Sequence, residues 1–447
     1  MNRREFFKKA GITAAGGVAL PYILPSGRLF AQTNTPKAEY VVLVMFAGGV
    51  RQQESILGRY LEDSQGVTGA AGNIMPNLFK GSIPTKKIVF GTDPGGNQTA
   101  GSEPIPRILS QSMEESGTVF KEVLAQSAGH YVGLNTLITG SSGTAQGLKV
   151  RPRYPTIFEY LRKHANFKAT DCWFVCNTIG NSYPLLNSSN NKDYGLQYGG
   201  NMFAAPVTFG SYGREILGNA KPYSQADLEP MYFMKNFLDQ SFGLSADQLT
   251  TIKNTDQERT QIKEFVRQIF QRQLAGQIVK PPVTDGGDAV NISYAAEVLR
   301  YFKPKFLTVN MASVDGCHSN FTGYLRSMHR ADHATGWLWN YIENNIPEMA
   351  GKTIMIVAPE CGRNLDSNPI LDQNDWYAFD HSDANALRVW TVMKGKGVPT
   401  LSVGSETNRI GRLTDIVPTI ADIFGIYNDV MNSGYIDPLA QSLYNRM

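Results

Sequence analysis

The sequence predicts an α/β fold with a doubly wound, mostly parallel sheet and helices on both faces. Apolar, strand-like runs alternate with amphipathic helical segments along the chain. The runs are almost continuously apolar, as expected for parallel strands that are covered on both sides. A chain of 447 residues with 42% apolar and 18% charged side chains can bury the core that such a sheet needs.

The elements follow one another in a regular order. The first predicted strand spans residues 38–49 and ends at Gly48 and Gly49, where the backbone can turn sharply or approach a ligand. Three helix–turn–strand units, a last strand and a closing amphipathic helix follow at residues 154–177, 294–316 and 333–360, at 386–398, and at 411–426. In sheets of this kind, ligands bind at the carboxyl ends of the strands.

The N-terminal segment is typical of a twin-arginine export signal. Arg3 and Arg4 precede a moderately apolar stretch that is rich in Gly and Ala. Glycines and a proline interrupt this stretch, which falls short of the ~20 apolar residues that span a bilayer. We expect residues 1–31 to be the signal and residues 32–447 to be an exported domain without a transmembrane helix, periplasmic or associated with the cell envelope. A basic helix on a soluble domain is the alternative.

Residues 183–290 differ from the alternating units. The first part is rich in Asn, Ser, Gly and Tyr and predicts loops, and a helix follows from a capping box at Ser245 and Gln248. We interpret this stretch as an insertion or cap over the sheet. The net charge of +3, from 42 basic and 39 acidic side chains, predicts no nucleic-acid-binding surface.

Four cysteines are too few for a disulfide scaffold in a chain of this length. Cys172 and Cys176 lie in a predicted strand and are interpreted as core thiols. Cys317 and Cys361 flank the segments that carry the candidate site. They could pair with each other, Cys361 could ligate a metal as a thiolate, or both could be free buried thiols.

Several strand ends carry side chains that bind metals. Asp315 and His318 follow one predicted strand, Glu360 follows another, and His381 precedes a third. Carboxylates and imidazoles collected from several strand ends form a plausible set of ligands for a divalent cation. The end of the first strand adds Arg51, which could hold an anionic substrate.

A second histidine pair has weaker support as a metal site. His329 and His333 stand four residues apart in one predicted helix, a spacing that can bind zinc on one helix face. The same helix carries Arg326 and Arg330, which together with the histidines predict a solvated polar face.

The chain also resembles the alkaline phosphatase superfamily, which includes sulfatases, nucleotide pyrophosphatase/phosphodiesterases and cofactor-independent phosphoglycerate mutases. Asp315 and His318 match its Asp–His metal pair, and His381 matches its later metal-binding histidine. The similarity is greatest to an uncharacterised, twin-arginine-exported branch in which Glu-Phe-Gly-Arg replaces Asp-His-Gly. The segments that carry the resemblance are "MPNLFKGSI", "GLNTLITG", "YPTIFEYLRKHANFKAT", "TIMIVAPECGRN" and "TDIVPTIADIFGI".

The chain departs from that family at the positions that would hold a second cation. The first strand ends in Phe46-Ala47-Gly48 where the family has a metal-binding Asp, and the Asp-His pair reads Glu360-Cys361. The nucleophile position, nine residues before Thr139, is His130. The remaining ligands favour one metal over two: zinc first, with calcium or manganese as alternatives.

The resemblance implies roles for individual residues. Asp315, His318, Glu360 and His381 would bind the metal, and His130 would act as acid/base or as an unusual nucleophile. Arg363 would steady a phosphate or sulfate oxygen during catalysis, and Arg51 would bind the substrate. Two functions are therefore open: a metal-dependent hydrolase of small phosphate or sulfate esters with a degenerate site, or a non-catalytic envelope protein that serves binding, structure or assembly with a protein partner.

Overall fold

The computed structural model describes most of the domain that the sequence predicts. The described residues are 35–84, 104–145, 150–176, 186–205, 254–284 and 286–447, with isolated positions at Tyr22–Ile23, Leu29–Phe30 and 252. The export signal predicted for residues 1–31 lies outside the described residues apart from those isolated positions. Parts of the insertion predicted for residues 183–290, including Ser245 and Gln248, also lie outside them, so both remain predictions.

The centre of the structure is an eight-stranded sheet in the order β10-β4-β9-β8-β3-β7-β5-β6. All neighbouring strands pair in parallel except β9, which is antiparallel to both β4 and β8. A separate pair, β1 (Tyr22–Ile23) and β2 (Leu29–Phe30), is antiparallel. The strands of the main sheet are β3 (Tyr40–Phe46), β4 (Thr118–Leu124), β5 (Cys172–Cys176), β6 (Asn201–Phe203), β7 (Phe306–Met311), β8 (Thr353–Pro359), β9 (Arg388–Gly395) and β10 (Leu401–Val403).

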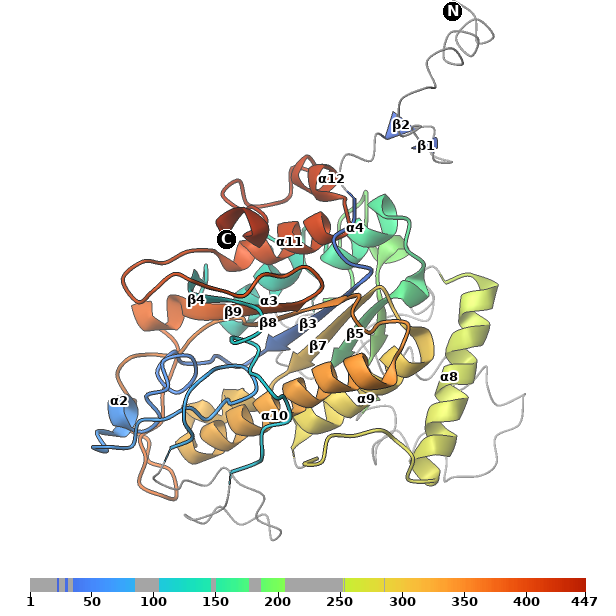
Figure 1. Ribbon diagram of the computed structural model, residues 1–447. Helices are drawn as coiled ribbons and strands as arrows, with labels where there is room; N and C mark the ends of the chain where they lie inside the picture. The colour runs from blue at the N-terminus through green and yellow to red at the C-terminus, as the bar shows by residue number, and fades with distance from the viewer. Residues whose placement is uncertain are drawn as a thin grey trace, which may run out of the picture.

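Helices cover both faces of this sheet (Figure 1). The α-helices of the described residues are α2 (Glu62–Gln65), α3 (His130–Thr139), α4 (Ile157–His164), α8 (Asp256–Leu274), α9 (Gly287–Phe302), α10 (Phe321–Asn345), α11 (Ile416–Ile423) and α12 (Tyr427–Met431). Helices α8, α9 and α10 contribute to the core on one face, and α3, α4, α11 and α12 to the core on the other. None of the helices in the described part of the chain is long and apolar enough to cross a membrane.

The central strand β3 shows why this sequence forms a buried sheet. Val42, Val44 and Phe46 point into the core on the side of α9 and α10, whereas Leu43 and Met45 point into the opposite core. All seven residues of β3 are buried. Because successive side chains of a strand alternate between faces, a continuously apolar run is what a strand covered on both faces requires.

The predicted fold class is confirmed, and β3, β5, β7, β8 and β9 lie where the apolar runs placed them. Strands β4, β6 and β10 were not predicted, because β6 and β10 are only three residues long and a Lys–Glu pair interrupts the apolar run of β4. Helix α8 has its capping box at Thr255 and Glu258. It packs on the core, with the ring of Phe265 6.0 Å from that of Trp173.

The solvated face predicted for the middle of α10 is wrong. His329 and His333 are 1% and 3% exposed, and Arg326 and Arg330 are also buried. The Nδ1 of His329 hydrogen-bonds the Ile74 carbonyl, which fixes the tautomer, and Nε2 accepts from the N–H of Ile105. Both nitrogens of His329 therefore hold neighbouring loops against the helix, and neither is available to a metal.

Candidate metal centre

The carboxyl ends of β3, β7 and β8, which are neighbours in the sheet, form the base of the candidate site. Asp315 and His318 lie in the 3-10 helix η4 (Ser313–His318) that follows β7. Glu360 directly follows β8, and His381 lies in the loop before β9. His130, the first residue of α3, completes the group. The structure thus brings together five of the residues that the sequence predicted.

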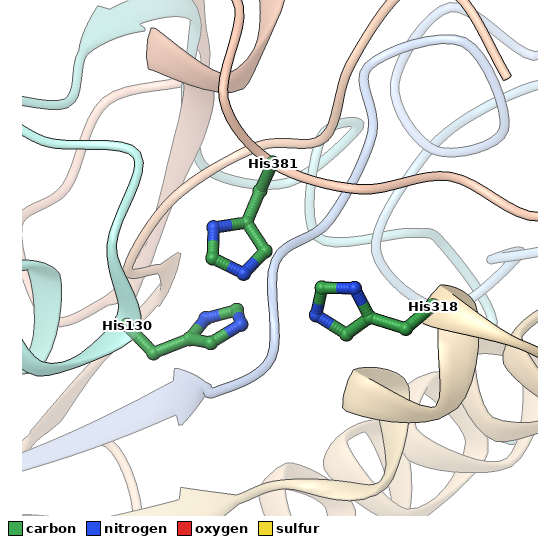
Figure 2. A group of neighbouring side chains, drawn as sticks. All are labelled: His130, His318 and His381. Carbon is green, nitrogen blue, oxygen red and sulfur yellow. The ribbon is translucent and has the colours of Figure 1, made fainter. Parts of the chain in front are cut away.

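Three histidines face one another across this site. His130, His318 and His381 each offer one ring nitrogen, and these three atoms lie within 4.8 Å of one another. The ring of His381 lies 4.1 Å from that of His130 and 4.9 Å from that of His318, measured between centroids. Figure 2 shows the three rings around a common space, to which each contributes from a different segment of the chain.

The outer nitrogen of each ring has a hydrogen-bond partner. The Nδ1 of His381 donates to the Ala128 carbonyl at 2.6 Å, and this bond fixes its proton on Nδ1. The Nδ1 of His318 lies 2.7 Å from Asp380 Oδ1, and that of His130 lies 2.7 Å from Glu360 Oε1. This pattern leaves the three Nε2 atoms directed at the shared space. Metal-bound histidines typically have such a partner on the second nitrogen.

Asp315 adds an oxygen to the same space. Its Oδ1 lies 3.1 Å from His130 Nε2 and 3.5 Å from His318 Nε2. Burial opposes the charge of Asp315, but His130, Arg363 and His318 outweigh burial and lower the pKa of this carboxyl to about 2. Asp315 is therefore ionised at neutral pH, and 38% of its side chain is exposed.

Two histidines of the group differ in charge. Burial opposes protonation of His130, but hydrogen bonds with Asp315, Cys361 and Glu360 outweigh it and raise the pKa of the ring to about 12. His381 has a pKa lowered to about 4, first by burial and then by the positive charges of His130 and Arg363. A cation that binds through His130 would displace a proton from that ring.

Glu360 lies beneath His130 and is completely buried. Its Oε1 accepts hydrogen bonds from the backbone N–H groups of Gly48 and Gly49 as well as contacting His130 Nδ1. Its Oε2 has no hydrogen-bond partner among the described residues. Toward the three histidines Glu360 thus acts as an orienting group that holds the end of β3 and the ring of His130. Its role as a direct metal ligand stays a prediction.

Two glycines make this close packing possible. A Cβ atom on Gly48 would lie 2.4 Å from the backbone nitrogen of Asp315, and the φ of Gly48 is +121°, a conformation that favours glycine. A Cβ atom on Gly133 in α3 would lie 2.4 Å from the carbonyl oxygen of Glu360. Because these two positions carry no side chain, the end of β3 can approach Asp315 in η4, and α3 can approach Glu360 after β8.

Arg363 is completely buried below the site. Its guanidinium donates to the carbonyl oxygens of Gly48, Gly49 and Phe379, and it pairs with Asp315 Oδ1 at 3.2 Å. The predicted contact with a substrate oxygen does not fit this placement, because the guanidinium is engaged on all sides by the protein itself.

Arg51 is likewise buried and engaged. It donates to Glu54 Oε1 and to the carbonyl oxygens of Asn364 and Leu365, and its guanidinium lies 4.0 Å from the ring centre of Phe379. The role predicted for Arg51 in substrate binding is therefore not supported by its position. Both arginines instead fix the loop that leads to His381.

The cysteines near the site are buried thiols. Cys317 and Cys361 are free, as are Cys172 and Cys176. The Sγ of Cys361 lies 3.5 Å from His130 Nδ1. Burial and the neighbouring charge of Glu360 raise the pKa of the Cys361 thiol to about 11.

Sequence reasoning missed the two outer acceptors, Asp380 and the Ala128 carbonyl. Asp380 stands next to His381 in the sequence, but its hydrogen bond goes to His318, 62 positions away. This bond lowers the pKa of Asp380. The only signal in the sequence was a carboxylate beside a candidate ligand, and a carbonyl group carries no signal at all.

The residues present fit a divalent cation. Three imidazole nitrogens and a carboxylate oxygen are ligands that suit zinc. The acceptors on the outer nitrogens are those that orient histidine toward a metal. Calcium, which takes about six to eight oxygen ligands, fits this nitrogen-rich set poorly.

Comparisons with known proteins bear on the fold. No protein-family model and no curated protein matches the chain. Among solved structures, the chain is similar to a protein in the alkaline phosphatase superfamily from Vibrio parahaemolyticus, with 11% identity, a TM-score of 0.41, and coverage of 95% of this chain and 76% of that one. In fold, the chain is similar to alkaline phosphatase superfamily proteins.

Two other structures show the same degree of similarity. A variant of the alkaline phosphatase PafA gives 10% identity and a TM-score of 0.45, with 93% of this chain and 100% of that chain covered. The lipoteichoic acid synthase LtaP from Listeria monocytogenes gives 9% identity and a TM-score of 0.38, with 95% and 78% covered. Similarities of this size do not decide the chemistry of the chain, which depends on the side chains of the site.

Proposed function

We propose that this chain is a metal-dependent hydrolase of phosphate or sulfate esters that uses a single cation. The observation that supports it is the convergence of His130, His318 and His381, each with an acceptor on its outer nitrogen. In this proposal the three Nε2 atoms and Asp315 hold the cation. His130, for which the sequence suggested an acid/base role, becomes a ligand.

A cation held there would supply a Lewis acid that polarises an ester oxygen and activates water. The protein's own residues prepare the site for it. Glu360 and Asp380 hold the rings of His130 and His318 in place, and Arg363 fixes the Asp315 carboxylate from below. Zinc is the first candidate, and manganese is the alternative.

The proposal includes export of the folded domain through the twin-arginine pathway, with the site in the periplasm or at the cell envelope. The paired Arg3 and Arg4 and the short apolar stretch after them support this location. Twin-arginine cargo is commonly folded before export, often with a cofactor inserted, which is compatible with a metal loaded beforehand.

The second candidate is a non-catalytic protein on the same fold that binds a partner at the envelope. One observation favours it: Arg51 and Arg363 are both buried, so neither presents a guanidinium to an anionic substrate. In that case the cation, or the imidazolium of His130, would serve to hold the strand ends together.

Metal analysis combined with a screen of aryl phosphates and aryl sulfates separates the two candidates. The hydrolase should contain stoichiometric zinc or manganese, and its turnover should be lost on chelation and regained on adding the metal. His381→Ala should lose both metal and turnover. His164→Ala, which removes a histidine on α4 beside Tyr194, is the matched control and should keep both. A protein that binds the metal without turnover, or that binds none, would favour the second candidate.

A further inference from the structure

We propose that Cys361, Glu360 and His130 form a second cation site, selective for thiophilic divalent ions such as cadmium, that competes with the three-histidine site. The proposal does not depend on hydrolase activity. It assigns His130 to two alternative sets of ligands, one on each side of its ring.

The placement of the three donors supports this site. One donor atom from each of these residues lies within 4.8 Å of the other two. His130 Nδ1 is 2.7 Å from Glu360 Oε1 and 3.5 Å from Cys361 Sγ. Glu360 and Cys361 are fully buried, and Glu360 Oε2 has no hydrogen-bond partner among the described residues. A buried carboxylate oxygen without a partner is costly unless a cation or a donor satisfies it.

The charges balance when an ion binds there. Binding would release the proton of the Cys361 thiol and the proton of His130 Nδ1 to solvent. The ring of His130 would keep its proton on Nε2, facing Asp315 Oδ1 at 3.1 Å. A divalent ion would then be offset by the thiolate and by the Glu360 carboxylate, so the buried group stays neutral overall.

The two sites exclude each other because of His130. A neutral imidazole has a single lone pair, so it binds through Nδ1 or through Nε2 but not through both. Carboxylates lie on both sides of this ring: Glu360 Oε1 is 2.7 Å from Nδ1 and Asp315 Oδ1 is 3.1 Å from Nε2, so a negative charge faces either nitrogen. Thiolates prefer soft ions, whereas the three-histidine set suits zinc. The nature of the ion would therefore decide which side is filled.

The experiment is a titration of the metal-free, full-length protein with cadmium, followed by the ultraviolet charge-transfer absorbance of cadmium–thiolate bonds. We expect a saturable band in the wild-type protein that is lost in Cys361→Ser. The matched control is Cys317→Ser, which removes a buried thiol outside this group and should keep the band. His318→Ala removes only the other site and should also keep it. Zinc added beforehand should weaken the band, and His318→Ala should abolish that effect.

Three outcomes would overturn the proposal: no band in the wild-type protein, a band that persists in Cys361→Ser, or a band that is lost in His318→Ala. If Cys361→Ser does not fold, cadmium NMR on the wild-type protein decides the question, because a shift typical of nitrogen and oxygen ligands alone would contradict a thiolate site. None of these measurements uses turnover. A chain that binds cadmium through Cys361 but hydrolyses no ester would refute the proposed function and leave this inference standing.

Discussion

The two sides of the His130 ring differ in exposure and in what their groups do. On the Nε2 side, Asp315 and His318 each have 38% of the side chain exposed, and their free atoms face the space between the histidines. On the Nδ1 side, Glu360 and Cys361 are fully buried, as is Arg363, which pairs with Asp315. Residues from the same three strand ends therefore differ in accessibility: the Nε2 side is open to a ligand, whereas Glu360 on the Nδ1 side also holds the backbone after β3.

The comparison shows that residues of the same chemical type can have different roles on the two sides of the ring. A carboxylate on either side could bind a cation, but Glu360 Oε1 is occupied by two backbone N–H groups, whereas Asp315 is open to the site. An arginine beside the site could bind an anion, but Arg363 satisfies carbonyl oxygens below it. Exposure and existing hydrogen-bond partners, and not residue identity alone, decide how freely each group can bind a ligand.

The largest expected effect is a loss of stability when the buried Arg363 is replaced. Arg363→Met would leave the carbonyl oxygens of Gly48, Gly49 and Phe379 without their buried donor, and each buried acceptor left unsatisfied costs roughly 1–3 kcal/mol. Urea unfolding should show this loss. Arg153→Met, on an exposed arginine, should change stability by no more than about 0.5 kcal/mol. Equal stability of the two variants would mean that Arg363 is not structural.

A smaller effect is expected where α3 meets the buried side. Gly133→Ala would place a Cβ atom 2.4 Å from the Glu360 carbonyl, and overpacking of this kind costs roughly 1–3 kcal/mol. In an open helix the same change would gain up to about 1 kcal/mol. Thermal unfolding would show whether Gly133→Ala lowers or raises the stability of the protein. Gly316→Ala, where no atom lies within 4 Å of the added Cβ, should be nearly neutral.

On the Nε2 side of His130, we expect a substitution to weaken metal binding and to leave folding unchanged. Asp380→Ala removes the acceptor on His318 Nδ1, and loss of such an outer acceptor lowers metal affinity roughly 10–100-fold. Competition with a chelator would measure the zinc affinity. The exposed Asp366 provides the control, since Asp366→Ala should leave the affinity unchanged. An unfolded Asp380→Ala variant would place this carboxylate with the structural groups instead.

Asp332 on α10 offers a milder test of what burial does to a carboxylate. Like Glu360 it is buried and accepts backbone N–H groups, those of Asn77 and Leu78. Burial raises the pKa of Asp332 to about 7 from an ordinary value of 3.8. A raised pKa in the folded state means that the contribution of Asp332 to stability is complete below pH 3.8 and is lost as the pH rises through about 7.

The difference in unfolding free energy between wild type and Asp332→Asn should therefore shrink across that interval. Urea titrations at pH values on either side of about 7 would measure it. A difference that grows with pH would show that the three N–H donors around Asp332, rather than its burial, set the pKa.

The sequence alone was enough to predict the central strands of the sheet and the strand ends at which the site lies. The apolar runs of β3, β7 and β8 are typical of strands covered on both faces, and parallel strands bring their carboxyl ends to one edge. Asp315, His318, Glu360 and His381 follow or precede such strands, so their proximity was predictable. His130 was predicted only through the resemblance to the alkaline phosphatase superfamily, which places the nucleophile nine residues before Thr139.

Which of these groups face the open space and which are buried follows from the three-dimensional packing and could not be read from the sequence. The roles of Glu360, Arg51 and Arg363 depend on how the loops after β3 and β8 run, and the partner of Asp380 depends on a contact across 62 positions. Such contacts depend on the directions of the side chains and on which backbone carbonyl groups at the strand ends are not hydrogen-bonded within the sheet. A one-dimensional pattern places residues at the edge of a sheet but does not specify which atoms they meet there.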